Sequence, residues 1–188
     1  NPGDLAEKVD INPSDSVEAG DVLMVDPNTP DTYTKTTVSY EPTVAGVVST
    51  NPTIIVGNGK TSQTAPMAMV GRVPVKVSTI NGAIQRGDLL VASDIPGTAM
   101  KYDASQDNSR KIVGIIGIAL ENTSTDNTKV LTLVRTGWVY NKTEAAVKLE
   151  QQVQVIAAAE GIDIGQDPAA LGVTGSGGGQ LTYSGGDL

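Results

Sequence analysis

The chain has 188 residues, 39% of them hydrophobic, which is enough to bury the core of one sizeable domain or two small ones. It contains no His and no Cys, which removes the usual general base near neutral pH, disulfides and zinc-thiolate sites. The formal net charge is -8 and the 13 Lys and Arg residues are scattered singly, which argues against a nucleic-acid partner.

The composition also indicates what fills the core. Phe is absent and there is one Trp, so Val, Ile, Leu, Ala and Met must form the interior, and the β-branched residues among them suit strands. No apolar stretch approaches the roughly 20 residues that span a bilayer, so we expect no membrane insertion. The chain starts at Asn1 without Met, so we expect that an upstream segment was removed or that the chain is a fragment. No motif suggests a cofactor.

Short apolar runs alternate with turn-forming residues along the first 140 positions. The runs are DVLMVD, VAGVVS, TIIVG, PMAMVGRVPVKV, DLLVAS, KIVGIIGIAL and KVLTLVRTGWVY, each bounded by Gly, Pro, Asn, Asp or Ser. This pattern is typical of a multi-stranded β domain. We therefore predict a mainly β domain over residues 1–140.

Two parts of this domain are similar to each other. VEAGDVLMVD (17–26) matches IQRGDLLVAS (84–93), and VAGVVS (44–49) matches VGIIGI (113–118) with almost the same spacing, which pairs Gly46 with Gly114. The match predicts two copies of one β unit, residues 14–79 and 80–140, although short valine-rich strands can also resemble each other by chance. Two such units packed back to back would form a single sandwich or barrel.

Both units contain a Gly-Asp pair just before a strand, Gly20-Asp21 and Gly87-Asp88. One interpretation is a tight turn, in which Gly adopts positive φ and the carboxylate accepts turn N–H groups. The other interpretation makes Asp21 and Asp88 a carboxylate pair for acid–base chemistry. Their recurrence at the same place in both units favours the turn.

The stretch IIVGNGKTSQT (54–64) has the look of a phosphate-binding loop, because two glycines precede Lys60 and Thr61. A P-loop needs a further glycine at position 54, which is Ile, and must open a helix. The residues that follow are poor helix formers and include Pro66. We therefore predict a flexible polar loop between two strands and no nucleotide partner.

Two further stretches give structural expectations. DPNTPD (26–31) offers oxygen ligands, but it departs from a calcium-binding EF-hand loop, so we predict a solvated turn and no metal site. RVPVKV (72–77) alternates as a half-buried strand does. Pro74 lies on the same side as Arg72 and Lys76, which favours an edge strand.

The last quarter of the chain changes character. Residues 141–161 contain good helix formers with Leu149, Val153 and Ile156 on one face, and Gly161 as a stop, which predicts one helix over about 142–159. This apolar stripe could dock on the chain's own domain or pack as a coiled coil against the same helix of other subunits in a trimer.

Residues 162–188 are predicted to be a flexible Gly-rich linker and a β-capable tail. The linker includes GSGGG at 175–179, and the tail contains Leu181 and Tyr183. Residues 180–184 could add to a sheet edge, including one on a neighbouring subunit, or form a frayed terminus.

Four blocks carry a family resemblance: GDLAE (3–7), VAGVVSTNPTIIVGN (44–58), GRVPVKVSTINGAIQRGDLLVASDIPGTAMK (71–101) and VGIIGIALE (113–121). They resemble the C-terminal domain of long bacterial surface proteins and phage appendages, where a fibrous β stalk ends in D-x-A-E followed by V-x-G-V-V-S-x-N-P and G-R-V-P-V-K-V. The first two blocks are also similar to the self-cleaving intramolecular-chaperone domain of phage neck-appendage and tail-fibre proteins. The similarity covers about residues 3 to 135.

The resemblance to the self-cleaving family implies a chaperone segment that helps a trimer form and is released by cleavage beside an acidic residue. Glu7 is the matching position. No Ser or Thr lies among residues 1–6, so the hydroxyl nucleophile expected for an acyl shift is missing.

These observations favour a structural, non-catalytic module of an extracellular filament, pilus-like fibre or phage appendage, located at a cell surface or on a virion. Its expected partner is itself, through sheet edges and terminal segments. The alternatives are an autoproteolytic domain that uses Glu7, and a capsid decoration protein.

Overall fold

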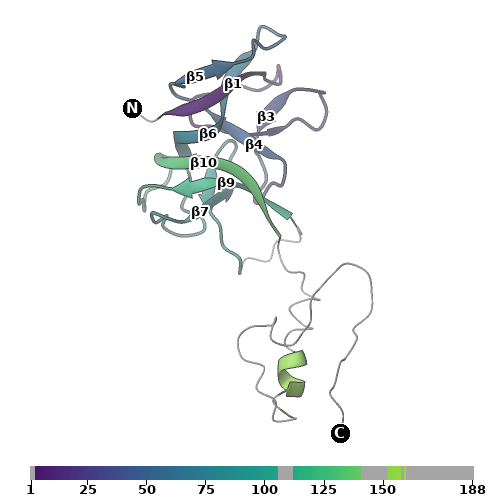
Figure 1. Ribbon diagram of the computed structural model, residues 1–188, viewed down its shortest axis with the longest axis vertical. Helices are drawn as coiled ribbons and strands as arrows, with labels where there is room; N and C mark the ends of the chain where they lie inside the picture. The colour runs from purple at the N-terminus through teal and green to yellow at the C-terminus, as the bar shows by residue number, and fades with distance from the viewer. Residues whose placement is uncertain (1–2, 106–111, 141–151, 158, 160–188) are drawn as a thin grey trace, which may run out of the picture. The chain divides into compact units, whose positions relative to one another are not determined.

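The computed structural model describes residues 3–105, 112–140, 152–157 and 159. The chain divides into two compact units, Asn1–Asn141 and Lys142–Leu188, which are described one at a time. Among the described residues of the first unit, ten strands form one continuous, barrel-like sheet (Figure 1). This confirms the predicted mainly β class.

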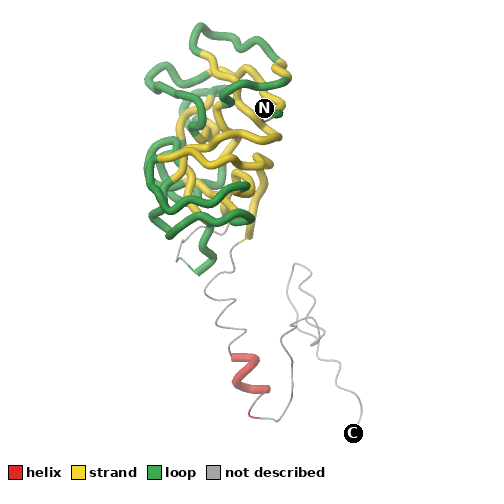
Figure 2. The backbone as a smooth tube through the Cα atoms, turned by 90° about the vertical axis from the view of Figure 1, so that its left-hand side faces the viewer, coloured by secondary structure: helices red, strands yellow, loops and turns green. Residues whose placement is uncertain are grey.

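The strands coincide with the apolar runs of the sequence, and the turn-rich stretches connect them on the outside of the unit (Figure 2). In chain order the strands are β1 (Asp4–Asp10), β2 (Val22–Val25), β3 (Tyr33–Lys35), β4 (Val44–Val48), β5 (Ile54–Val56), β6 (Thr64–Val77), β7 (Leu89–Ala92), β8 (Ala99–Lys101), β9 (Ile112–Ala119) and β10 (Thr128–Tyr140).

The strand pairings close into a first ring in the order β1, β6, β4, β2 and β3. β1 runs antiparallel to residues 64–71 of β6. The ring closes where Ile11, just after β1, forms a parallel bridge with Tyr33 of β3. Closure of this kind satisfies backbone groups that an open sheet would leave at its edges.

A second ring repeats the same connections in the order β6, β10, β9, β7 and β8. Here residues 70–77 of β6 pair with β10, and a parallel contact between Val77 and Ala99 closes the ring. The first half of β6 therefore belongs to the first ring and its second half to the second ring. The predicted units, residues 14–79 and 80–140, do not coincide with these rings, because the first ring includes β1 and the second ring includes residues 70–77 of β6.

The pairings identify which residues of the two rings are equivalent. Leu23 of β2 faces Gly46, and Leu90 of β7 faces Gly117, each beside a register shift. The structural counterpart of Gly46 is therefore Gly117, whereas the spacing along the sequence matched it with Gly114. The spacing was misleading because the residues between the Gly-Asp pair and this strand differ in number between the units, and cross-strand hydrogen bonds fix the register.

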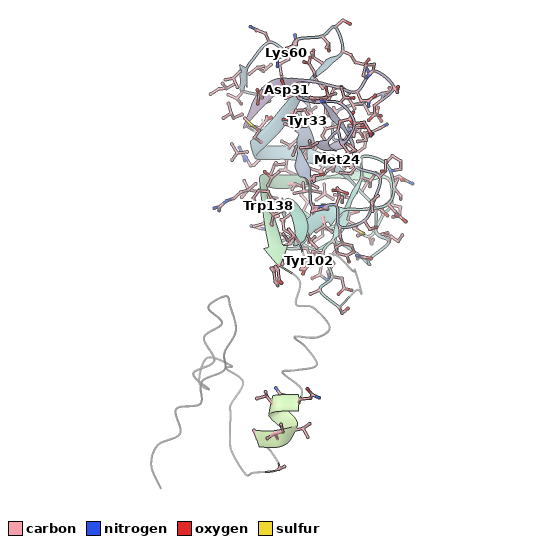
Figure 3. The ribbon with its side chains drawn as sticks, turned by 90° about the vertical axis from the view of Figure 1, so that its right-hand side faces the viewer. Met24, Asp31, Tyr33, Lys60, Tyr102 and Trp138 are labelled. Atoms are coloured by element: carbon pink, nitrogen blue, oxygen red, sulfur yellow. The ribbon has the colours of Figure 1, made fainter. Side chains whose placement is uncertain are left out.

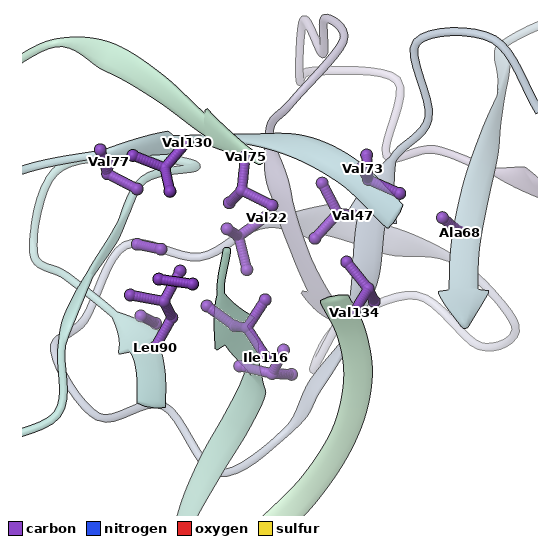
Figure 4. Packing of buried hydrophobic residues seen from close by; sticks show 14 of the residues in the cluster. Val22, Val47, Ala68, Val73, Val75, Val77, Leu90, Ile116, Val130 and Val134 are labelled. Atoms are coloured by element: carbon purple, nitrogen blue, oxygen red, sulfur yellow. The ribbon is translucent and has the colours of Figure 1, made fainter. Parts of the chain in front are cut away.

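Each ring has its own aliphatic core. The core of the first ring contains Val9, Ile11, Leu23, Val48, Ala65 and Met67. The core of the second ring contains Val75, Val77, Leu90, Ala99, Ile116, Val130 and Val134 (Figure 4). These β-branched and small side chains fill the space that aromatic residues occupy in many other domains.

The prediction that Pro74 lies in an edge strand is wrong. β6 is an interior strand of the sheet, and Pro74 faces Leu131 of β10. On the other side, the N–H of Arg72 donates to Gly3 O and the N–H of Lys76 donates to Gly20 O, each at 3.0 Å. The nitrogen of Pro74 points between these two contacts, where no backbone donor is required. The missing N–H of proline therefore leaves no ladder hydrogen bond unmade, and a central strand accommodates it.

In the second unit, residues 152–157 and 159 are helical. They lie within the predicted helix, and the rest of that helix and the predicted tail lie outside the described residues. Within the described residues, no helix combines the length and the apolar character needed to cross a membrane.

Candidate functional site

A small polar cleft lies where β1, β3 and the loop after β5 meet. Figure 3 shows three of its side chains, Asp31, Tyr33 and Lys60, at the same end of the β unit. Its volume of about 240 Å³ is below the roughly 300–1,000 Å³ of typical small-molecule pockets. It is lined by Glu7, Lys8, Val9, Asp10, Asp31, Tyr33 and residues 57–60.

The loop that resembles a phosphate-binding loop holds an internal anion. The N–H of Lys60 donates to Asp10 Oδ1 at 2.8 Å, and the N–H and hydroxyl of Thr61 donate to the same oxygen at 2.9 and 3.0 Å. These hydrogen bonds, led by that from the Thr61 N–H, lower the pKa of the buried Asp10 carboxyl. Consecutive N–H groups bind an anion as in a nest, and the anion is a carboxylate of β1.

Two of the remaining charged residues of the cleft are paired with each other. Lys60 forms a salt bridge with Asp31, which raises the pKa of its ammonium group. Burial and the nearby carboxylates of Glu7 and Asp31 raise the pKa of the Tyr33 hydroxyl. Tyr33 supplies the hydroxyl among the lining residues, and its raised pKa keeps it protonated near neutral pH, so this geometry does not activate it as a nucleophile.

Glu7, the candidate acid–base residue, is half-buried in β1 between Val56 of β5 and Met67 of β6. Its position at the cleft brings it near Tyr33, a relation that the sequence alone does not show. No Ser or Thr lines this cleft. The residues that line the cleft therefore offer a carboxylate but no Ser or Thr hydroxyl for an acyl shift.

Both Gly-Asp pairs form turns with the same hydrogen bond. Gly20 and Gly87 have φ of 94° and 98°. Asp21 Oδ2 accepts a hydrogen bond from the Glu18 N–H, and Asp88 Oδ2 accepts one from the Gln85 N–H, each at 2.8 Å. The two carboxylates thus cap their own turns, one in each ring.

The first of these turns also joins the two rings. Lys76 Nζ of the second ring lies 2.6 Å from Asp21 Oδ1 and also binds the Glu18 carboxylate. Although burial lowers the pKa of Lys76, its hydrogen bonds with Asp21 and Glu18 raise it above its ordinary value. The sequence predicted the turn but not this ion pair, because Lys76 is far away along the chain.

The acidic turn at residues 26–31 is exposed from Pro27 to Asp31, as predicted, and only its first residue is buried. Asp26 is buried, and its Oδ1 accepts a hydrogen bond from the Asn28 N–H at 2.8 Å. Asp31 is exposed and forms the salt bridge with Lys60. Among the described residues, no group of three or more carboxylates gathers as a metal site would require.

The sequence pattern does not identify strand β5 as a candidate site. This strand pairs in parallel with β1, and within the described residues its other edge has no strand partner. Its three side chains, Ile54, Ile55 and Val56, are 56%, 55% and 45% exposed. The sequence signal was the run TIIVG next to a polar loop, which marks an apolar strand without showing that it lies at an edge.

The predicted assembly residues of the C-terminal segment are only partly described. Val153 is half-buried and Ile156 is 62% exposed in the helical stretch. Leu149, Leu181 and Tyr183 lie outside the described residues.

Comparison with known proteins does not assign this chain to a family: no protein-family model matches it, and a search of curated proteins finds no match.

Proposed function

We propose that this chain is a structural, non-catalytic module of an extracellular filament, fibre or phage appendage, and that it assembles with copies of itself. The observation that carries this proposal is the apolar edge formed by β5. Natural β proteins usually protect edge strands with charges, prolines or covering segments. β5 is short, with three residues, but Ile54, Ile55 and Val56 carry no charge and no proline, and all three side chains are exposed.

The chemistry of the cleft supports the same proposal. Its volume is small, Lys60 is paired with Asp31, and the anion-binding loop is filled by Asp10. The resemblance to surface and appendage proteins supplies the cellular setting, outside the cell or on a virion.

Electron microscopy of the purified full chain tests the proposal. We expect filaments or discrete multimers, and the variant Ile55→Lys should reduce their number, since a charge at the centre of β5 opposes edge pairing. Thr53→Lys, just before β5, is the matched control. Particles that remain single chains at every concentration would contradict the proposal.

The alternative of self-cleavage rests on the position of Glu7 at the cleft. Mass spectrometry of the chain expressed with its natural upstream sequence separates the two functions. We expect an uncut product. A cut that occurs in the wild type and is lost in Glu7→Gln would establish the autoproteolytic function instead.

A further inference from the structure

The two rings pack against each other through a row of three apolar side chains on the outer face of the first ring. Val22, Val47 and Ala68 lie side by side on β2, β4 and β6, and all three are 0% exposed. They belong to the same buried cluster as Val73, Val75 and Leu90 of the second ring, and Figure 4 shows Val22 and Val47 among these side chains. The outer face of the first ring is therefore built to be covered by another β unit.

The second ring has the same row on its outer face. In the first ring, Val22 pairs with Val47, and Val47 pairs with Ala68. At the equivalent positions of the second ring, Leu89 pairs with Ile118, and Ile118 pairs with Leu133. Leu89, Ile118 and Leu133, here named the outer row, are larger than their counterparts. Leu89 is half-buried, and Ile118 and Leu133 are 38% and 37% exposed.

We propose that the outer row is a docking surface for a second copy of this chain. This inference rests on the proposed self-assembly and identifies one of its contact surfaces. The equivalent face of the first ring is covered by a β unit of the same construction, which makes a β unit the fitting occupant of the outer row. The first ring of the same chain is already packed against the second ring, so another copy must supply that unit.

The contact between copies does not repeat the contact between the rings. In the internal contact, Gly97 lies against Asp21, and a Cβ at Gly97 would come within 2.8 Å of Asp21 Oδ1. The equivalent position in the first ring is Asp31, which has φ of 55° and carries a side chain. If a second copy repeated the internal contact, its Asp88, the counterpart of Asp21, would meet the carboxylate of Asp31. This would cause steric conflict and like-charge repulsion.

The loop after β5 obstructs the same place. In the second ring the N–H of Lys76 donates to Gly20 O across the internal contact. In the first ring the equivalent residue is Asp10, which is bound by Lys60 and Thr61 of the loop. Head-to-tail stacking of rings is thus blocked, and the outer rows of the copies face one another around a symmetry axis, as in a closed oligomer.

Sedimentation velocity of the full chain tests which surface is used. Ile118→Lys places a charge in the middle of the outer row, and we expect it to weaken self-association by about tenfold or more. Ile80→Lys is the matched control, because Ile80 is 58% exposed in a loop outside the row. A wild-type oligomer that withstands Ile118→Lys would overturn the outer row and leave the proposed function standing, whereas a wild-type monomer at all concentrations would overturn both.

Cysteine labelling provides a second measurement that does not depend on a disruptive charge. The chain has no Cys, so Ile118→Cys introduces a single thiol, with Ile80→Cys as the control. We expect the rate of maleimide labelling at position 118 to fall as the protein concentration rises, while the rate at position 80 stays constant. Equal rates at both positions would overturn the proposal. Slow labelling at position 118 even in dilute monomer would also overturn it, by showing that a segment of the same chain covers the row.

Discussion

Lys76 is the residue whose replacement tests the contact between the rings most directly. Its Nζ binds Asp21 and Glu18, and the Asp21 side chain is 2% exposed while that of Lys76 is 24% exposed. The variant Lys76→Met keeps most of the aliphatic stem but leaves the carboxylate of Asp21 buried without a cation.

The size of the effect follows from this geometry. Removing one partner of a buried ion pair costs about 3–5 kcal/mol. Two features reduce the cost here, because Lys76 is partly exposed and Asp21 Oδ2 still accepts a hydrogen bond from the Glu18 N–H. We therefore expect the free energy of unfolding to fall by about 2–3 kcal/mol, which is at or below the lower limit of that range.

Urea denaturation followed by circular dichroism measures this loss. In the double variant Lys76→Met/Asp21→Asn the uncompensated charge is removed, so its loss of stability should be smaller than the sum of the two single losses. Strict additivity, or a loss below about 0.5 kcal/mol in Lys76→Met, would refute the role assigned to this ion pair.

The remaining predictions concern close packing, acid sensitivity and the outer row. Gly46→Ala and Gly117→Ala would each place a Cβ against a backbone carbonyl of the neighbouring strand, so thermal melts should show losses of about 1–3 kcal/mol, and unchanged melting would contradict the register. The lowered pKa of Asp10 means that its ionised form stabilises the fold above the unfolded value of 3.8, and this contribution is lost as the pH falls through the folded-state pKa. Amide hydrogen exchange at residues 60–61 should accelerate in that acid range, and Asp10→Asn should remove the pH dependence. An exchange rate that changes neither with pH nor with the substitution would contradict this account. Val47→Ala should lower the free energy of unfolding by about 2–3 kcal/mol, and Ile118→Ala should lower it by less, since only Val47 is fully covered. Urea denaturation at low protein concentration measures both losses, and the reverse order would contradict the assignment of the two rows.

The strands and the turns between them were predictable because their signals are local. Alternating apolar residues marked the strand that contains Val73, Val75 and Val77, and these side chains are buried in the second ring. The Gly-Asp pairs carry turn chemistry within four residues, so their hydrogen bonds do not depend on distant parts of the chain.

The contacts that organise the two rings could not be predicted in this way. The anion of the loop at residues 57–61 comes from Asp10, and the partner of Asp21 is Lys76, both far away along the chain. The position of Pro74 shows the same limitation. Its preference for an edge was correct as a general tendency, but the gap between the Gly3 and Gly20 contacts removes the need for its missing N–H.

The candidate surfaces also depend on the fold rather than on sequence pattern. Ile118 and Val47 look alike in the sequence as strand residues, yet one is 38% exposed and the other is buried. The difference arises because the first ring has a neighbour within the chain and the described part of the second ring leaves its outer row partly exposed. Exposure of this kind is decided by tertiary packing. The comparison of the two rings shows that the exposed Ile118 occupies the position of the buried Val47.

Sedimentation equilibrium of the purified full chain tests the central claim, self-assembly, most directly. One chain has a mass of 19.3 kDa. Our account predicts a concentration-dependent mass that rises to a multiple of this value. A mass of one chain at every concentration, up to the solubility limit, would contradict it.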